Sequence, residues 1–263
     1  MRKSNVAFLV LLFALFIMPL GVLGLYAASA GWTFPQVIPE TLSSRALDYV
    51  TGQIRPIAMS LGSSLLYSLL TALLTFILCL YPAQVFARQN FRYKALLEGL
   101  LLAPALAPAM TFSMGVHFLF IKLNLADRMI GVVLVLTIFT YPYMLRTLVS
   151  GYMSFGPEYD LCAKNLGAGP VTRLLRVEFP LLLPAAIAGG SVVFLIAFSE
   201  YFLVFLVGGG SVPSYSGYLF PFLTSSDRSV ASMLTLVFLV VPIILFILIE
   251  TTIARVYRRR GLA

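Results

Sequence analysis

PEYDLCAKNLGAGPVTRLLRVEFPLLLP, residues 157–184, is a charged, helix-patterned segment set between long apolar runs. Four of its residues recur at the helical spacing i, i+3, i+4 and i+7 and are predicted to share one face: Tyr159, Cys162, Ala163 and Leu166. The opposite face is predicted to carry Asp160, Lys164 and Asn165. Pro157 suits a first helical position, the acids Glu158 and Asp160 suit the positive end of the helix dipole, and Gly167 suits a left-handed C-terminal residue. The pattern therefore predicts a short helix over residues 157–167.

A second helical piece is predicted after the turn at residues 168–170. It runs from residue 171 to 178, with Leu174 and Leu175 facing inward and Arg173 and Arg176 facing outward. Pro180 opens the next apolar run.

Composition places the chain in a membrane. Hydrophobic residues make up 60% of the 263 residues and charged residues only 11%, whereas a soluble domain has about 25% charged residues. A helix needs about 20 apolar residues to cross a bilayer. We therefore expect an all-α integral membrane protein with six spans, at residues 6–28, 57–85, 96–120, 130–149, 181–207 and 230–253.

Several details of these spans remain open. A cleavable signal peptide competes for residues 6–28, but the apolar run is longer than the usual core of such a peptide. Pro104 and Pro108 predict a kinked third span that packs against neighbours. Residues 31–55 and 208–228 are predicted to be polar connections, the first without a helix of spanning length.

The basic residues orient the spans. With both termini in the cytoplasm, thirteen of the 18 Lys and Arg residues lie inside: Arg2, Lys3, Arg88, Arg92, Lys94, Arg146, Lys164, Arg173, Arg176, Arg255, Arg258, Arg259 and Arg260. The other five lie outside: Arg45, Arg55, Lys122, Arg128 and Arg228. The net charge of +8 thus follows from topology and argues against nucleic-acid binding. This orientation also puts residues 157–178 in the cytoplasm.

The residues of an active site are missing from the sequence. His117 is the only histidine, which excludes a histidine metal cluster, and helix packing explains it better than metal ligation. No Gly-Lys-Ser/Thr follows Gly208-Gly209-Gly210, so this run is predicted to be a flexible loop and not a phosphate cradle. We expect no cofactor or metal in this chain. Any ATP and Mg²⁺ would be bound by another subunit.

Glu200 is the one acid well inside a predicted span. Inserting a carboxylate at that depth of a membrane costs about 2.5–3.5 kcal/mol, so such a side chain is expected to face an interior cavity or a partner. A hydrogen bond to a neighbouring helix, or protonation, is the competing explanation.

The segment 157–184 resembles the cytoplasmic signature of permease subunits of binding-protein-dependent ATP-binding-cassette (ABC) importers. The matching positions are Ala163, Leu166, Gly167, Ala168, Arg173, Pro180, Leu183 and Pro184. Leu161 stands where the family has Glu, and Cys162 where it has its first Ala. The segment Phe198-Ser199-Glu200-Tyr201 resembles the Phe-Asp-Glu of polyamine-type permeases, with Ser199 replacing an acid.

The resemblance implies the type I importer permease fold in a bacterial inner membrane. Residues 1–55 would form the first helix and a periplasmic connection, 56–255 the permease core, and 256–263 a basic tail. The expected partners are ABC ATPase subunits, a second permease subunit that forms a heterodimer with this chain, and a periplasmic binding protein. The expected solute is polyamine-like or another small polar organic compound; thiamine, ferric-ion and phosphonate permeases share the architecture.

The resemblance also assigns site residues. ATPase coupling is expected at Glu158, Asp160, Leu161, Cys162, Ala163, Lys164, Leu166, Gly167 and Arg173. The translocation pathway is expected at Ser199, Glu200 and Tyr201. An exposed Leu161 would give the ATPase an apolar contact, with Asp160 supplying charge.

Other functions fit the residues less well. A membrane-embedded enzyme needs more acids or histidines at matching depth, and a channel or secondary carrier needs inverted repeats or unwound polar half-helices. For residues 157–178, the alternative to an ATPase-coupling role is an ordinary amphipathic helix that lies on the bilayer surface.

Overall fold

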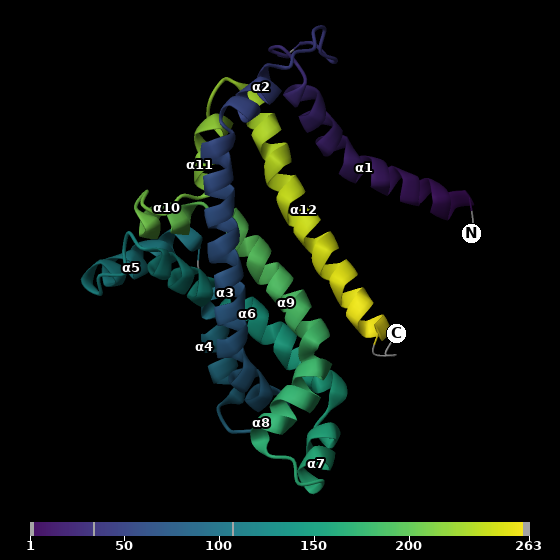
Figure 1. Cartoon of the computed structure of the whole chain (residues 1–263), viewed down its shortest axis with the longest axis vertical. Coiled ribbons are helices and arrows are strands. Elements are labelled where there is room, and N and C mark those ends of the chain that lie inside the picture. Colours follow the sequence, from purple (N-terminus) through teal and green to yellow (C-terminus); the bar gives the residue numbers. More distant parts are fainter. Residues whose placement is uncertain (1–2, 34, 107, 260–263) are drawn as a thin grey trace. The chain divides into compact units, whose positions relative to one another are not determined.

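The computed structural model describes residues 3–33, 35–106 and 108–259, and their regular structure is helical (Figure 1). Its elements in chain order are α1 (Lys3–Ala27), α2 (Arg45–Gly52), α3 (Ile54–Arg88), α4 (Lys94–Leu106), α5 (Ala109–Lys122), α6 (Met129–Phe155), α7 (Glu158–Asn165), α8 (Pro170–Arg173), η1 (Leu174–Glu178), α9 (Phe179–Ser199), α10 (Phe202–Gly208), α11 (Tyr215–Leu223) and α12 (Arg228–Arg259). Arg2, Arg260 and the rest of the predicted tail after it lie outside the described residues.

Four described helices are long and apolar enough to cross a membrane: Ile54–Arg88, Met129–Phe155, Pro170–Ser199 and Arg228–Ile249. Shorter apolar helices occupy Leu11–Ala27 and Met110–Lys122. The prediction of an all-helical membrane protein is confirmed, and the count of six spans stays a prediction.

Two predicted spans are broken in the structure. The third is divided into α4, which ends at Leu106, and α5, which begins at Ala109. Pro108 lies at this break, because proline lacks the amide hydrogen that a continuous helix requires. The fifth stops at Ser199 and resumes at Phe202. The expectation of a plain polar loop at residues 208–228 is also wrong, because α11 lies within it.

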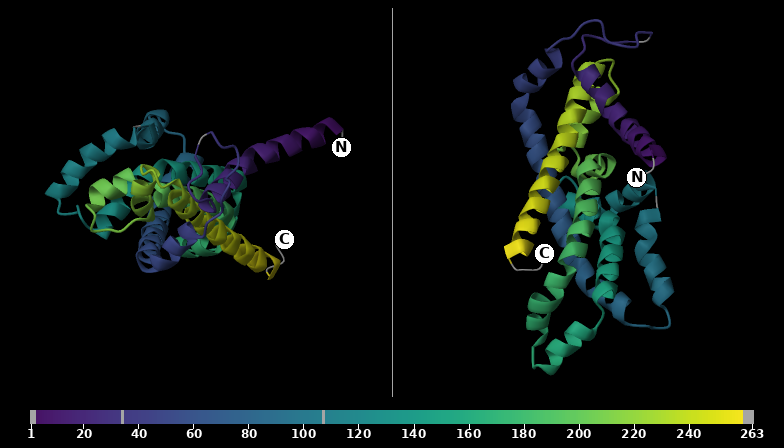
Figure 2. Two further views of the ribbon diagram at one scale, coloured as in Figure 1. Left: turned by 90° about the horizontal axis from the view of Figure 1, so that it is seen from above. Right: turned by 90° about the vertical axis from the view of Figure 1, so that its right-hand side faces the viewer.

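The chain forms two compact units, one of residues 61–216 and one of residues 1–60 with 217–263. In the first unit, α6 and α9 lie side by side (Figure 2). A Cβ added at Gly151 would lie 2.6 Å from Cβ of Ala185, and one at Gly189 would overlap the Thr147 hydroxyl. Thr147 and Gly151 lie four residues apart on α6, and Ala185 and Gly189 lie four residues apart on α9. These small residues let the two backbones approach closely.

Apolar side chains fill this first unit in two clusters. One surrounds Tyr67, Leu136 and Val207, and the other surrounds Cys79, Leu145 and Leu182. Helix α3 contributes to both clusters. It therefore supports α6 and α9, the two helices that precede and follow the segment 156–178 in the chain.

The second unit pairs α1 with α12, and α2 also packs on α12. Ser229 donates to the Ala27 carbonyl at 3.4 Å, which joins the end of α1 to the first turn of α12. Arg45 and Asp227 form an ion pair of 2.6 Å beside this junction.

Candidate functional site

Helix α7 begins and ends where the sequence predicts. Gly156 (φ 66°) separates it from α6, and Gly167 (φ 82°) follows it in the left-handed conformation. The Gly167 amide donates to the Lys164 carbonyl and the Ala168 amide to the Ala163 carbonyl, both at 3.0 Å. This pair of bonds is the Schellman motif, in which glycine avoids the strain that a side chain would bring. The predicted left-handed role of Gly167 is confirmed.

The structure shows which side of α7 is covered. Three of the four residues predicted to share one face are exposed: Tyr159 by 56%, Leu166 by 83%, and Cys162 as well. Asp160, predicted on the opposite face, has a side chain only 17% exposed, and Ala163 is half-buried. The helix therefore turns its carboxylate toward the rest of the unit and its apolar residues away from it, because Asp160 has cationic partners there.

Those partners belong to a partly buried cluster that we call the four-charge cluster: Arg88, Asp160, Arg173 and Glu178. Arg173 Nη1 lies 3.1 Å and Arg88 Nη1 3.5 Å from Asp160 Oδ2, and Arg88 Nη1 lies 2.9 Å from Glu178 Oε1. Two positive and two negative charges are thus brought together from α3, α7, α8 and η1. Buried charges are tolerated when they are paired in this way.

Glu178 is the most buried member, at 3% exposure. Gln84 donates to its carboxylate at 2.8 Å and Tyr152 at 3.4 Å, in addition to Arg88. The guanidinium of Arg88 lies over the Tyr152 ring, 5.2 Å from its centroid. Cation–π contact stabilises the face of the guanidinium, which hydrogen bonds leave free.

The segment after α7 also corrects a prediction. Residues 171–178 are helical as expected, and the helix begins one residue early, at Pro170. Leu175, however, is 60% exposed, and Arg173, expected to face outward, points into the four-charge cluster. Residues Leu174–Glu178 form a π-helical turn, in which the Phe179 amide donates to the Leu174 carbonyl. This wider turn changes the helical register, so the wheel drawn from the sequence does not hold across it.

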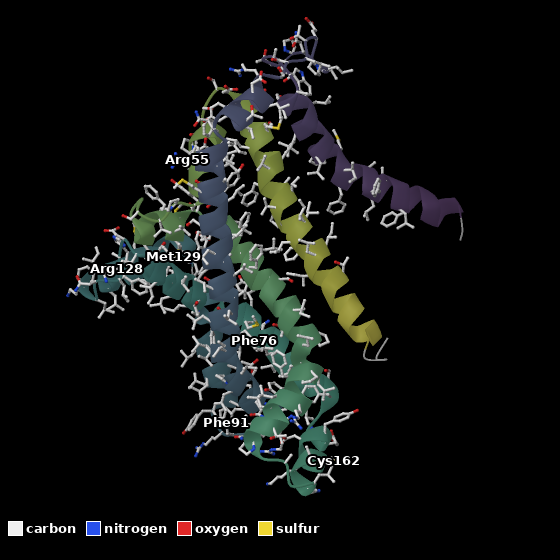
Figure 3. The ribbon with its side chains drawn as sticks, viewed as in Figure 1. Arg55, Phe76, Phe91, Arg128, Met129 and Cys162 are labelled. Atoms are coloured by element: carbon white, nitrogen blue, oxygen red, sulfur yellow. The ribbon has the colours of Figure 1, made fainter. Side chains whose placement is uncertain are left out.

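The other predicted coupling residues lie on or next to α7. Glu158, Leu161 and Lys164 are exposed, and Leu161 is 52% exposed. Figure 3 shows Cys162 at the lower end of the 61–216 unit, far from Arg128 and Met129. The exposed apolar residues of α7, which are Tyr159, Leu161, Cys162 and Leu166, thus lie at one end of this unit.

The predicted pathway residues lie at the break between α9 and α10. Glu200 has extended backbone angles, and its carboxylate accepts a hydrogen bond from the Leu203 amide at 3.2 Å. Its carbonyl accepts one from the Ser216 hydroxyl at 3.1 Å. Ser199 donates back to the Leu195 carbonyl, and the Tyr201 ring stacks on Phe205. Glu200 therefore lies just before the N-cap residue Tyr201 and accepts from an amide in the first turn of α10, instead of lying inside a continuous helix.

A family model described as "Binding-protein-dependent transport system inner membrane component" matches residues 80–260, which include α7, the four-charge cluster and the α9–α10 break. This chain belongs to that family.

Relatives of this inner membrane component carry different transport names. The molybdenum transport system permease protein ModB of Mycobacterium tuberculosis is 30% identical over 131 residues, 45% of this chain and 50% of that protein. The spermidine/putrescine transport system permease protein PotC of Haemophilus influenzae is 28% identical over 124 residues, 47% of this chain and 48% of that protein. The chain spans about half the length of these curated relatives.

A solved structure confirms the permease fold of the inner membrane component. A bacterial ABC transporter involved in the import of the acidic polysaccharide alginate aligns over 94% of both chains, with a TM-score of 0.71 and 14% sequence identity. Because the sequence identity is low, this similarity shows a shared fold only.

Sequence reasoning missed Arg88 and Glu178 as site residues. Glu178 stood at the end of a predicted surface helix, and Arg88 was counted only toward topology. A weak signal was available, because Gln84 and Arg88 lie four residues apart at the polar end of an apolar helix and so share one face. Nothing in the sequence joined that face to residues 160–178. Among the described residues, no group of three or more His, Cys, Asp and Glu side chains is placed to hold a metal.

Proposed function

We propose that this chain is a permease subunit of an ABC importer and forms half of the pathway for a small solute, with ATP hydrolysed by a separate subunit. The observation that carries this proposal is the set of exposed apolar residues on α7. Asp160 ties the helix to Arg173 of the same unit, while Tyr159, Leu161 and Leu166 remain uncovered. Exposed large apolar side chains on a short, capped helix suit a protein partner.

The four-charge cluster supports a mechanical role for α7. Asp160 ties the helix to Arg88 at the end of α3 and to Arg173, and Glu178 ties Arg88 to the start of α9. A force that an ATPase applies to α7 would therefore be transmitted to two long apolar helices through partly buried ion pairs. Such contacts resist sliding because separating either pair leaves an unpaired buried charge.

Asp160 does not suit the role expected from the sequence. Its carboxylate is engaged by two arginines of its own chain, so we propose that docking uses the apolar residues of α7 and the outward-facing Lys164. Glu158 is exposed at the helix start and adds negative charge near Gly156. Gly167 and Arg173 would act indirectly, by shaping and holding the helix.

For the solute we propose a polyamine-like or other small polar organic compound. Glu200 supports this choice of solute, because it is an acid in the break between α9 and α10, next to Ser199 and Tyr201. Relatives named for molybdenum and for spermidine/putrescine show that the family name alone does not choose among solutes. The charge of Glu200 favours a cationic or hydrogen-bonding solute over an anion.

The proposed assembly has two ABC ATPase subunits, a second permease and a periplasmic binding protein, in a bacterial inner membrane with both termini cytoplasmic. ATP and Mg²⁺ belong to the ATPases. A channel or secondary carrier is the second candidate, and it would need no ATPase contact at α7.

The test is co-purification of the ATPase with variants of this chain. Leu161→Asp should reduce recovery of the ATPase at least tenfold, because it places a charge in an apolar contact. Leu123→Asp is the matched control, since Leu123 is equally exposed, at 56%, and follows α5. Equal recovery for both variants would rule out docking through α7 and leave the amphipathic surface helix as its explanation.

A further inference from the structure

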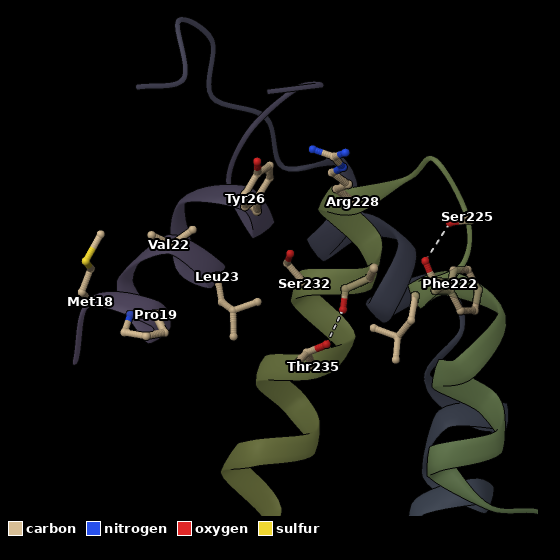
Figure 4. Close-up of a pocket in the computed structure, with 12 residues that line it drawn as sticks. Met18, Pro19, Val22, Leu23, Tyr26, Phe222, Ser225, Arg228, Ser232 and Thr235 are labelled. Atoms are coloured by element: carbon tan, nitrogen blue, oxygen red, sulfur yellow. Dashed lines mark hydrogen bonds between the residues drawn. The ribbon is translucent and has the colours of Figure 1, made fainter. Parts of the chain in front are cut away.

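A groove of about 670 Å³ lies between α1 and α12 in the unit formed by residues 1–60 and 217–263 (Figure 4). Helix α1 lines it with Met18, Pro19, Val22 and Leu23, and α12 with Ala231, Ser232 and Thr235. The residues from α12 are small, so they leave space opposite the larger residues of α1. Most of the groove wall is apolar, as an acyl chain requires.

One end of the groove is polar. Tyr26 and Arg228 lie together at this end in Figure 4, and both also line a smaller hollow of about 80 Å³. That hollow is further lined by Ser29, Thr33 and Arg45. Arg45 is paired with Asp227, whereas Arg228 has no acidic partner among the residues that the structure describes. An uncompensated guanidinium at the mouth of an apolar groove suits a phosphate group.

The position of this end along α12 fits the edge of a bilayer. Arg228 is the first residue of α12, whose next residues form a strongly apolar candidate span. The rings of Tyr26 and Trp32 are in tilted contact, with centroids 4.4 Å apart. Tyrosine, tryptophan and arginine together are typical of the membrane–water interface. The apolar part of the groove therefore runs from the headgroup region toward the hydrocarbon.

We propose that this groove binds one anionic phospholipid, with its phosphate at Arg228 and one acyl chain between α1 and α12. An acyl chain gains little by moving from the bilayer into another apolar surface. Selectivity must therefore come from the polar end, where Arg45 is neutralised by Asp227 and the charge of Arg228 favours a net negative headgroup over a zwitterionic one.

Native mass spectrometry of the purified full chain in detergent tests the proposal. We would titrate dioleoyl phosphatidylglycerol, dioleoyl phosphatidylcholine and inorganic phosphate separately. The expected result is one phosphatidylglycerol bound about tenfold more tightly than phosphatidylcholine, with no stable phosphate adduct. Arg228→Gln should remove the preference, and Arg55→Gln, an exposed arginine outside the groove, should keep it.

A second variant tests the acyl part of the site. Ser232→Phe fills the groove and should weaken binding of both lipids, whereas Val240→Phe, on an exposed part of α12, should change neither. Equal affinity for the two lipids, an unchanged preference in Arg228→Gln, or binding of phosphate alone would overturn the proposal. A further outcome would also refute the lipid proposal. If the chain forms dimers that Ser232→Phe dissociates, and shows no lipid preference, the groove binds a second copy of the chain.

Discussion

Arg88 Nη1 lies 2.9 Å from Glu178 Oε1 and joins residues 90 positions apart in the chain. Their side chains are 15% and 4% exposed. The bond fixes the last turn of α3 against the start of α9, and the same guanidinium nitrogen reaches Asp160 on α7. One arginine thus holds three elements of the candidate site.

Replacing Arg88 should destabilise the fold strongly. Arg88→Met leaves the Glu178 carboxylate buried without its cation, and breaking a buried pair in this way costs about 3–5 kcal/mol. The exposed pair Arg45–Asp227 is the control, and Arg45→Met should cost about 0–1 kcal/mol. Denaturant unfolding in detergent measures both. If Arg88→Met, Glu178→Gln and the double variant show strictly additive losses, the two residues do not act as a pair.

Gly167→Val should disturb α7 through backbone strain. Gly167 has φ 82° and open space around it, so the cost of about 1–3 kcal/mol comes from the left-handed conformation and not from a clash. Gly169→Val provides the comparison, since that glycine also has open space but lies at φ −68°. ATPase co-purification should fall for the first variant only. Loss of the ATPase in both would point to the loop surface instead.

Gly189→Ala should weaken the packing of α6 on α9. The added methyl group would overlap the Thr147 hydroxyl, and overpacking of this kind costs about 1–3 kcal/mol. The neighbouring Gly190 has nothing within 4 Å, so Gly190→Ala should leave the thermal midpoint unchanged or slightly higher. Identical midpoints for the two variants would show that this close approach is absent in solution.

Glu200 variants separate a structural role from a solute contact. Glu200→Gln keeps an oxygen that can accept the Leu203 amide, so its stability should match the wild type. Glu200→Ala loses the cap and about 0.5–2 kcal/mol. Solute-stimulated ATPase activity of the assembled importer should fall in the Gln variant if the charge faces the solute. Normal activity with the Gln variant would leave Glu200 only the role of a helix cap.

Labelling of the two native cysteines tests the topology. Cys162 is exposed on α7 and Cys79 is buried, so a membrane-impermeant maleimide should react with Cys162 alone. The basic-residue distribution predicts labelling in inverted vesicles and none in intact spheroplasts. A Cys162→Ser variant should remove the signal. Labelling from the outer face would reverse the predicted orientation.

The sequence by itself determined the features that depend on neighbouring residues. The apolar runs specified membrane helices, because spanning a bilayer requires only length and hydropathy. Gly167 specified the end of α7, because the Schellman bonds connect residues at most five positions apart. The signature around residues 163–184 indicated the family for the same reason.

Tertiary structure decided which side of each helix is covered. The wheel separated Asp160 from Tyr159 and Leu166, but it could not say that Asp160 faces inward, because Arg88 lies 72 positions earlier in the chain and sequence spacing contains no such distance. A paired carboxylate can be buried while apolar residues remain exposed for a partner. The break at Glu200 and the π-helical turn before Phe179 likewise depend on the packing of α9, and both changed the predicted register.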